Sequence, residues 1–395
     1  MKITSVECYA GAYLFVRVNT DAGISGWGEC GLAYGRCTEA AFGNCQDFAK
    51  AVIGMDPFDT EKIWNHLHRH TFWGMGGGVT LTAAMAAIDT ACWDIKGKAL
   101  GLPVYKLLGG KTNETLRCYA SQLQNGWRKA AQSGGVAMLY TPEEYYEVTK
   151  EAISEGYDAV KVDPVFCPPE PVDFAVIGNT LGHHVRGSYP LKELEIAKER
   201  IAAVREAAGP YADILIETHS LIDTNTAIQL ARTLEPFNIM YLEEPTCPEN
   251  PELFKVIAQH TSIPLATGER SYSRWGFRQF FQDRSLSMIQ PDLCNTGGIT
   301  ETKKICDMAE VYDMGVQIHV CGGPLATAAA LQVEAVIPNF IIHEEHCANL
   351  KAEYRKYGTH CYCPENGVYT IPDLPGIGEE VPEETLAQCR KVVIA

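Results

Sequence analysis

The sequence lacks an apolar run long enough to cross a membrane, and it lacks an excess of basic residues. Its 395 residues carry a formal net charge of −16, with a pI near 5.2. This balance argues against nucleic acid or an anionic membrane surface as the main partner. Residues 1–11 do not show a basic segment followed by a long apolar one, so we expect no signal peptide.

Cysteine pairs with the spacing of a metal or redox motif are also missing. The chain has 15 cysteines, an odd number without a CxxC pair, and the two nearest in sequence are Cys361 and Cys363. This distribution is typical of small buried side chains in a reducing compartment. We therefore expect a cytoplasmic protein, in which 46% apolar residues supply a large core.

The first part of the chain has the pattern of an α+β domain. Residues 3–29 contain three strand-like runs, and a turn ending at Gly23 separates the last two. Helical patterns follow to about residue 108, and Gly101 is suited to end the Ala-rich helix. We expect this domain at residues 1–112, completed by residues 358–395.

From residue 113 to residue 357, strand-like and helix-like segments alternate. One unit takes about 25 residues, and eight units predict an α/β fold, a modified (β/α)8-type TIM barrel. An open doubly wound sheet is the alternative, but it would not bring so many strand ends to one point. Residues 165–190, rich in proline and glycine, are expected to form a long loop over the mouth of the barrel.

Six acidic or histidine residues recur at the ends of apolar runs, at intervals of 23 to 27 residues. They are Glu217, Glu243, Glu269, Asp292, His319 and Glu344. Strand C-termini of a parallel barrel share one face, so we expect these side chains to meet there. Three converging glutamates repel one another unless a cation joins them. Oxygen ligands favour Mg²⁺ or Mn²⁺ over Zn²⁺, which predicts a metal site at Glu217, Glu243 and Glu269.

Two histidines have positions suited to proton transfer. His219 follows Glu217 by two residues, so alternation along a strand would place both on one face. His319 and Asp292 end neighbouring strands, where a carboxylate can hold one imidazole nitrogen and raise the basicity of the other. A lone histidine more often has a structural role. His219 and His319 differ from such residues because they lie at the predicted strand ends.

Several motifs resemble the enolase superfamily, in its mandelate racemase/muconate lactonizing enzyme-like branch. GWGE at residues 26–29 and the segment of residues 86–110 resemble the N-terminal capping domain of that family, and YLEEP, TGER, QPDLCNTGGIT and IPDLPGIG resemble its barrel and C-terminal motifs. The resemblance covers nearly the whole chain. The E-x-H pattern at Glu217 and His219 is closest to galactonate, gluconate and mannonate dehydratase-like members.

The resemblance implies a reaction and a role for each residue. Glu217, Glu243 and Glu269 match Mg²⁺ ligands, and the metal would stabilise an enediolate. His319 with Asp292 matches the dyad that removes the proton next to the carboxylate, and His219 matches the acid that helps the 3-hydroxyl to leave. Glu344 matches the residue that hydrogen-bonds the substrate near its carboxylate. The product would be a 2-keto-3-deoxy sugar acid.

The chain departs from the family pattern at two positions. Lys161-Val162-Asp163 stands where many relatives have Lys-x-Lys, which disfavours a racemase that uses the second Lys as a base. Lys161 is then either a charge-balancing group near the metal or a structural residue, and Asp163 either binds a substrate hydroxyl or pairs with Lys161. The first metal ligand is commonly Asp in the family and is Glu217 here.

Substrate choice is expected to come from two loops of the capping domain, residues 32–37 and 66–78. Arg36, Arg69 and Trp73 are candidates for contacting the distal polyol, as are His183 and His184 in the long loop, although loop residues of this kind can equally face solvent. The resemblance also implies a homo-oligomer. Two other functions stay open: an epimerase, racemase or cycloisomerase acting through the same enediolate, and a non-catalytic binding protein that retains the site.

Overall fold

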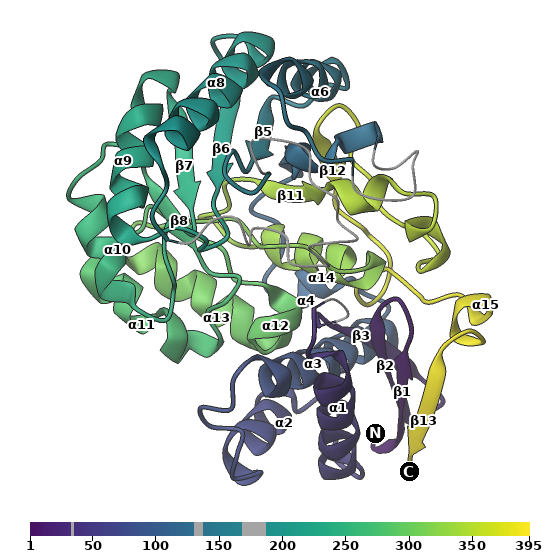
Figure 1. Ribbon diagram of the computed structural model, residues 1–395. Helices are drawn as coiled ribbons and strands as arrows, with labels where there is room; N and C mark the ends of the chain where they lie inside the picture. The colour runs from purple at the N-terminus through teal and green to yellow at the C-terminus, as the bar shows by residue number, and fades with distance from the viewer. Residues whose placement is uncertain (33–34, 130–136, 168–186) are drawn as a thin grey trace.

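The computed structural model describes residues 1–32, 35–129, 137–167 and 187–395 of the chain. Figure 1 shows a barrel of strands and helices at the top and a smaller α+β part below it, where both ends of the chain lie. The predicted fold class is therefore confirmed: a modified (β/α)8-type barrel with an α+β capping domain.

The capping domain is built on a four-stranded antiparallel sheet in the order β13-β1-β2-β3. Its strands are β1 (Ile3–Ala10), β2 (Leu14–Thr20), β3 (Ser25–Cys30) and β13 (Arg390–Ile394). Its helices are α1 (Thr38–Val52), α2 (Thr60–Asn65), a π-helix (His66–His70), α3 (Val79–Leu100) and α4 (Val104–Leu107). Gly101 ends α3 in the left-handed conformation, as predicted for this position.

Small residues allow β3 to lie directly on α3. A Cβ atom at Gly28 would lie 1.9 Å from the carbonyl oxygen of Ala87, and one at Gly26 would lie 2.1 Å from that of Ala91. No side chain fits in that space, so the two glycines of the GWGE motif set the distance between sheet and helix.

The barrel consists of eight parallel strands that lie side by side in chain order. They are β4 (Thr115–Ser121), β5 (Ala159–Val162), β6 (Asp213–Glu217), β7 (Ile239–Glu243), β8 (Leu265–Thr267), β9 (Met288–Ile289), β10 (Gly315–Val316) and β11 (His343–His346). β11 pairs with β4, and a parallel bridge between Val316 and Phe340 links β10 to the segment that enters β11. The sheet is thereby closed on itself.

Within the described residues, helices follow seven of the eight strands, with two helices after β9. They are α6 (Pro142–Ser154), α8 (Leu191–Ala208), α9 (Thr224–Leu234), α10 (Pro251–Ala258), α11 (Ser273–Asp283), α12 (Leu293–Thr296), α13 (Gly298–Val311) and α14 (Pro324–Glu334). Short 3₁₀ turns lie at Leu123–Asn125, Glu235–Phe237, Cys347–Leu350 and Tyr354–Lys356. The last two turns follow β11 in place of an eighth barrel helix, so the barrel differs from the eight complete units counted in the sequence.

The C-terminal tail is shared between the two parts of the molecule. β12 (Val368–Thr370) pairs antiparallel with β4 of the barrel, whereas β13, after the short helix α15 (Glu383–Leu386), pairs antiparallel with β1. The expectation that residues 358–395 return to the first domain agrees with β13 but not with β12, which pairs with Thr115–Arg117, the part of β4 that precedes its pairing with β11.

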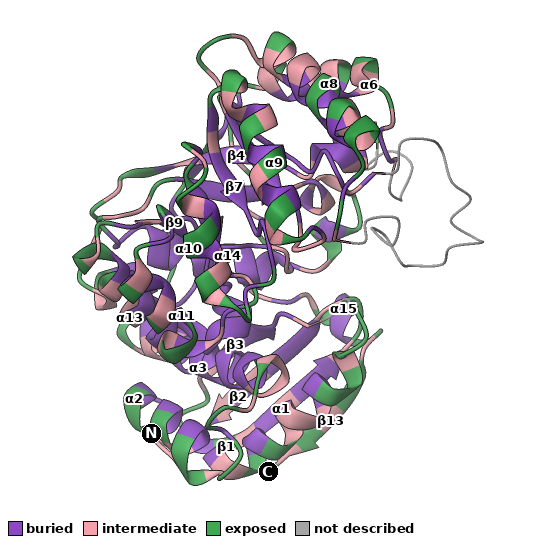
Figure 2. Ribbon diagram, turned by 60° about the vertical axis from the view of Figure 1, so that its left-hand side comes forward, coloured by how far each residue is buried: buried purple, intermediate pink, exposed green. Residues whose placement is uncertain are grey.

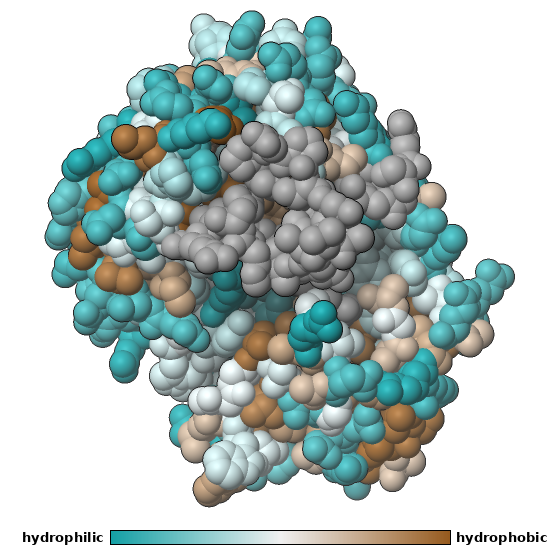
Figure 3. All heavy atoms as spheres, in the orientation of Figure 1, coloured by the Kyte–Doolittle hydropathy of each residue, from teal (hydrophilic) through white to brown (hydrophobic). Residues whose placement is uncertain are grey.

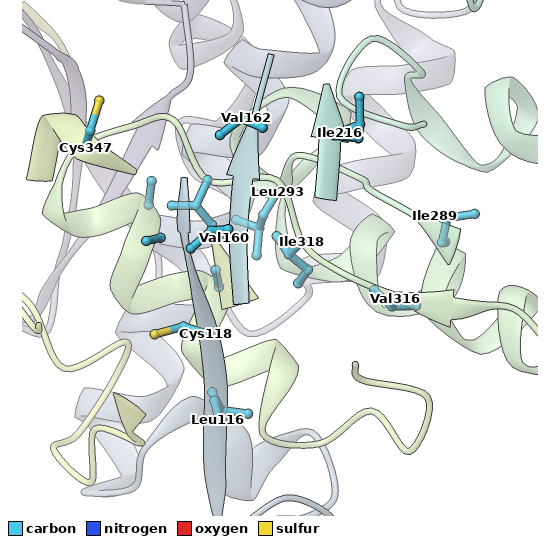
Figure 4. Close-up of a cluster of buried hydrophobic side chains, with 14 of the residues drawn as sticks. Leu116, Cys118, Val160, Val162, Ile216, Ile289, Leu293, Val316, Ile318 and Cys347 are labelled. Carbon is cyan, nitrogen blue, oxygen red and sulfur yellow. The ribbon is translucent and has the colours of Figure 1, made fainter. Parts of the chain in front are cut away.

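Alternation along the strands divides the barrel residues into an inner and an outer set. The outer set fills the shell between strands and helices, and includes Leu116, Cys118, Val160, Val162, Ile216, Ile289, Val316 and Ile318 (Figure 4). The inner set begins with an apolar floor of Tyr119, Ala159, Leu215, Tyr241, Ala266, Met288 and Ile342. Figure 2 shows the barrel strands and the inner sides of the barrel helices as mostly buried.

Hydrophilic side chains cover most of the outer helices on the face drawn in Figure 3, and hydrophobic ones gather at its lower right, over the capping sheet. Among the described residues, no helix is both long enough and apolar enough to cross the hydrocarbon layer of a membrane.

Candidate active site

Above the apolar floor, the strand ends carry a layer of buried ionisable residues around Lys161. The Lys161 Nζ lies 2.9 Å from Glu243 Oε2, 3.0 Å from Glu344 Oε1 and 3.6 Å from Glu217 Oε2. The side chain is 1% exposed. Burial opposes its charge, but Glu243 and Glu344 outweigh burial and raise the pKa of Lys161 well above its ordinary value. Lys161 is therefore an ammonium ion that balances carboxylates from three strands.

Negative charge still exceeds positive charge in this region. The described carboxylates at the mouth are Asp163, Glu217, Glu243, Glu244, Glu269, Asp292 and Glu344, whereas the permanent cations among their partners are Lys161 and Arg270. Glu217 and Glu243 lie opposite each other on β6 and β7. Burial and the neighbouring Glu217 raise the pKa of Glu243 well above its ordinary value. Another cation would relieve this repulsion.

The three glutamates fit a hard divalent cation in the chemistry of their donors. All three offer only carboxylate oxygens, and they come from the ends of the consecutive strands β6, β7 and β8. As these side chains are placed, the described part of the chain has no group of three or more acidic, histidine or cysteine side chains that could hold a metal ion. Glu243 is bound by Lys161, and Glu269 Oε2 lies 2.9 Å from His319 Nε2.

His319 and Asp292 form a dyad at the ends of neighbouring strands. His319 Nδ1 lies 2.8 Å from Asp292 Oδ2, and a parallel bridge joins the two residues. Asp292 also accepts hydrogen bonds from the Cys294 N–H at 2.8 Å and the Asn295 amide at 3.0 Å. Burial would lower the pKa of His319, but Glu269 and Asp292 outweigh burial and raise it well above its usual value. Asp292 thus holds the ring through Nδ1, and Nε2 lies on the side of the mouth, next to Glu269.

His219 has a carboxylate partner of its own, which the sequence did not reveal. Its Nδ1 lies 2.6 Å from Asp163 Oδ2, and Asp163 Oδ1 accepts the backbone N–H groups of Val165 and Phe166 at 2.8 and 2.7 Å. Asp163 is fully buried and pairs with His219 rather than with Lys161. The sequence position of the two residues could have indicated this pair, because they follow the neighbouring strands β5 and β6.

A turn, and not strand alternation, directs His219 into the mouth. β6 ends at Glu217, and His219 has a φ of 47°. Its N–H donates to Glu217 Oε1 at 2.7 Å. Gln122 after β4 and Glu244 after β7 are also left-handed, with φ of 62° and 44°. Such conformations cost non-glycine residues about 1 kcal/mol or more each, and they gather at functional sites.

A cavity of about 390 Å³ opens over this layer. Its walls carry His219, Glu269, Arg270 and His319 together with Leu32, Val79, Gln122, Asn125, Phe166, Tyr272, Asn295, Cys321 and His346. Glu344 lies just below, where it accepts hydrogen bonds from the Ser121 hydroxyl at 2.7 Å and the Val320 N–H at 3.1 Å. His346, Gln122 and Asn125 are lining residues that the sequence analysis did not single out.

The capping domain is fixed to the rim of this cavity by Glu29. Its carboxylate is buried and accepts the N–H groups of Gly323 and Ala326 at 2.6 and 3.2 Å, at the first turn of α14. Burial raises the pKa of Glu29 to about 8, although the backbone donors oppose this shift. α14 follows the β10 segment that carries His319, so Glu29 joins the two domains beside the dyad.

Two candidates for substrate contact do not line the cavity. Arg36 is exposed, and Trp73 is 73% exposed beside an equally exposed Phe72. Leu32, at the start of the first loop, and Val79, the first residue of α3 after the second loop, line the cavity instead. Arg69 is exposed as well, and His183 and His184 lie outside the described residues.

Family models match both parts of the chain. Residues 1–109 match the mandelate racemase / muconate lactonizing enzyme N-terminal domain, and residues 144–385 match the enolase C-terminal domain-like family. The chain belongs to the mandelate racemase/muconate lactonizing enzyme-like branch of the enolase superfamily. The family resemblance seen in the motifs is thus confirmed.

Relatives within this branch cover nearly the whole chain. The D-galactonate dehydratase of Variovorax paradoxus (strain S110) is 34% identical over 99% of this chain and 95% of its own length. That of Xanthomonas euvesicatoria pv. vesicatoria (strain 85-10) is 35% identical over 98% and 94%.

Solved structures agree with this membership. An enolase superfamily member from Salmonella Typhimurium has a TM-score of 0.94 at 48% identity, with both chains covered completely. A mandelate racemase/muconate lactonizing enzyme from Jannaschia sp. CCS1 has a TM-score of 0.84 at 30% identity, over 98% and 97% of the two chains. This member of the superfamily is an enzyme of the hydro-lyase class, and the non-catalytic alternative is set aside.

Proposed function

We propose that the enzyme is a Mg²⁺-dependent dehydratase that converts an acid sugar, an aldonate such as galactonate, gluconate or mannonate, to a 2-keto-3-deoxy acid. The observation that carries the proposal is the pair of His–Asp dyads at one cavity, His319 with Asp292 and His219 with Asp163. Loss of water needs a base at one carbon and an acid at the next. Two imidazoles with separate carboxylate partners supply both.

The positions of the dyads in the barrel support a division of labour. β6 and β10 are the third and seventh of the eight strands, so His219 and His319 reach the cavity from opposite walls. In the proposed reaction His319 Nε2 takes the proton from the carbon next to the carboxylate, and His219 Nε2 gives a proton to the departing 3-hydroxyl. Opposite walls favour anti elimination, in which proton and hydroxyl leave from opposite faces.

Glu217, Glu243 and Glu269 are the residues proposed to hold Mg²⁺. When bound, the ion would stabilise the negative charge of the enediolate that forms after proton removal. In the proposed reaction Glu344 orients the carboxylate end of the substrate, and Lys161 keeps the charge beneath it balanced. We also propose a cytoplasmic homo-oligomer: the 15 cysteines are all free thiols, and oligomerisation rests on the family resemblance alone.

A panel of aldonates and aldarates with MgCl2, assayed for 2-keto-3-deoxy product, tests the proposal. We expect turnover of at least one aldonate that EDTA abolishes. His319→Asn should lower the rate about 10³-fold and stop solvent deuterium exchange at C2. His260→Asn, at an exposed histidine outside the cavity, is the matched control. No product from any sugar acid would refute the dehydratase.

The opposed dyads also fit a second function, epimerisation at C2, in which His219 returns a proton to the face opposite His319. The same incubation separates the two reactions. Deuterium incorporation at C2 without loss of water would favour the epimerase.

A further inference from the structure

His346 is a cavity-lining histidine to which the reaction above assigns no role. It is the last residue of β11, two residues after Glu344, so both side chains face the inside of the barrel. Two residues along a strand span about 6.6 Å. His346 therefore lies one layer nearer the mouth than Glu344, level with the open cavity.

The backbone fixes the tautomer of His346. Its Nδ1 accepts the N–H of Ala348 at 3.0 Å, because His346 is the N-cap of the 3₁₀ turn Cys347–Leu350. An N–H group can only donate, so Nδ1 carries no proton and the ring proton is on Nε2. Burial, partly offset by Glu344, lowers the pKa of His346 to about 4. The ring is therefore neutral at physiological pH.

The Nε2–H of His346 has no hydrogen-bond partner in the described part of the chain, and the ring borders the cavity. Glu344, which in the proposed reaction orients the carboxylate end of the substrate, lies on the same strand one layer below His346. The carboxylate of an acid sugar therefore belongs in the layer of Glu344 and the three glutamates. The rest of its chain then extends from that layer toward the mouth, where His346 and Gln122 line the cavity.

We infer that His346 is a specificity-determining residue that donates its Nε2–H to a hydroxyl oxygen of the sugar chain beyond C3. This inference rests on the proposed function, because it assumes an acid sugar with a hydroxylated tail. A neutral donor of fixed direction suits a hydroxyl and offers no charge to a second carboxylate. The residue thus helps to select a polyhydroxy monoacid by the position of one hydroxyl.

Two variants separate this role from the structural cap. In His346→Asn the side-chain oxygen still accepts the Ala348 N–H, but the donor no longer reaches the cavity. In His346→Gln the amide nitrogen reaches approximately the place of Nε2, while the cap is lost. With MgCl2 and the aldonate that the wild type turns over, we expect the Asn variant to raise KM about 3- to 10-fold with little change in kcat. The Gln variant should recover most of this loss.

Glycerate is the probe without a tail, because it keeps the carboxylate and the 2- and 3-hydroxyls only. Its inhibition constant should be the same in the wild type and in His346→Asn. An unchanged KM for the aldonate, or weaker inhibition by glycerate, would overturn the inference. A raised KM and a lower Tm in the Gln variant, with an Asn variant that behaves as the wild type, would show a cap alone and overturn the inference. If the wild type dehydrates no sugar acid, the proposed function itself fails.

Discussion

Replacing Lys161 with Met should destabilise the metal-free enzyme strongly. The Lys161 ammonium is 1% exposed and lies within 3.0 Å of both Glu243 and Glu344. Met fills most of the same volume but leaves these carboxylates buried without their cation. Removing one partner of a buried ion pair typically costs about 3–5 kcal/mol. At roughly 2 °C per kcal/mol for a chain of this size, Tm should fall by about 6–10 °C.

Mg²⁺ should reduce the difference in Tm between Lys161→Met and the wild type. If Glu217, Glu243 and Glu269 bind the ion, it supplies the charge that the variant lacks. An ion at 100 times its Kd adds about 2.7 kcal/mol to the stability of the folded state. We therefore expect MgCl2 to raise the Tm of Lys161→Met more than that of the wild type.

Differential scanning fluorimetry in EDTA and in MgCl2 measures both effects. Lys198→Met is the matched control: its ion pair with Glu195 on α8 is 46% and 64% exposed, so its Tm should change by less than about 1 °C. A metal-free Tm of Lys161→Met within 1 °C of the wild type would show that Lys161 does not balance the carboxylates. An equal response of both proteins to MgCl2 would place the metal elsewhere.

Two further predictions concern the second dyad and the capping domain. Asp163→Asn should lower kcat about 100-fold with a smaller change in KM. The side-chain oxygen must still accept the Val165 and Phe166 N–H groups, so an amide nitrogen replaces the carboxylate oxygen 2.6 Å from His219 Nδ1. Steady-state kinetics in MgCl2 would contradict this if kcat were unchanged. Gly28→Ala should destabilise the fold by about 3 kcal/mol or more, since its Cβ would meet the Ala87 carbonyl oxygen at 1.9 Å. Gly43→Ala, in α1 with open space around it, should instead stabilise the fold by about 0.5–1 kcal/mol. Urea unfolding that ranks the two glycine variants equally would refute the packing argument.

Much of the architecture could be predicted because it depends on patterns within short segments of the sequence. Apolar runs, turn residues and the spacing of strand–helix units are properties of short segments, and they located the strands of both domains to within a few residues. Glu217, Glu243 and Glu269 were found for the same reason, since each follows an apolar run at a regular interval. The closed barrel then brings the strand ends together by symmetry alone.

The sequence was less informative where a side chain has several partners within reach. Lys161 and Asp163 stand two residues apart and invite pairing with each other, yet Lys161 bonds to Glu243 and Glu344, and Asp163 to His219. The partner that each of these side chains binds depends on the layer that the side chain occupies inside the barrel. The surface loops were harder still: Arg36 and Trp73 look suited to sugar binding, but Leu32 and Val79 line the cavity.

The sequence by itself determined the fold class, the row of acidic strand ends and the His319–Asp292 pair, because periodicity along the chain becomes proximity in a parallel barrel. Tertiary structure alone decided the second dyad at His219 and the tautomer of His346. Both depend on backbone turns just beyond the strands, a left-handed φ at His219 and an N-cap at His346. The direction of a ring after a strand has ended is set by these contacts and not by the strand pattern.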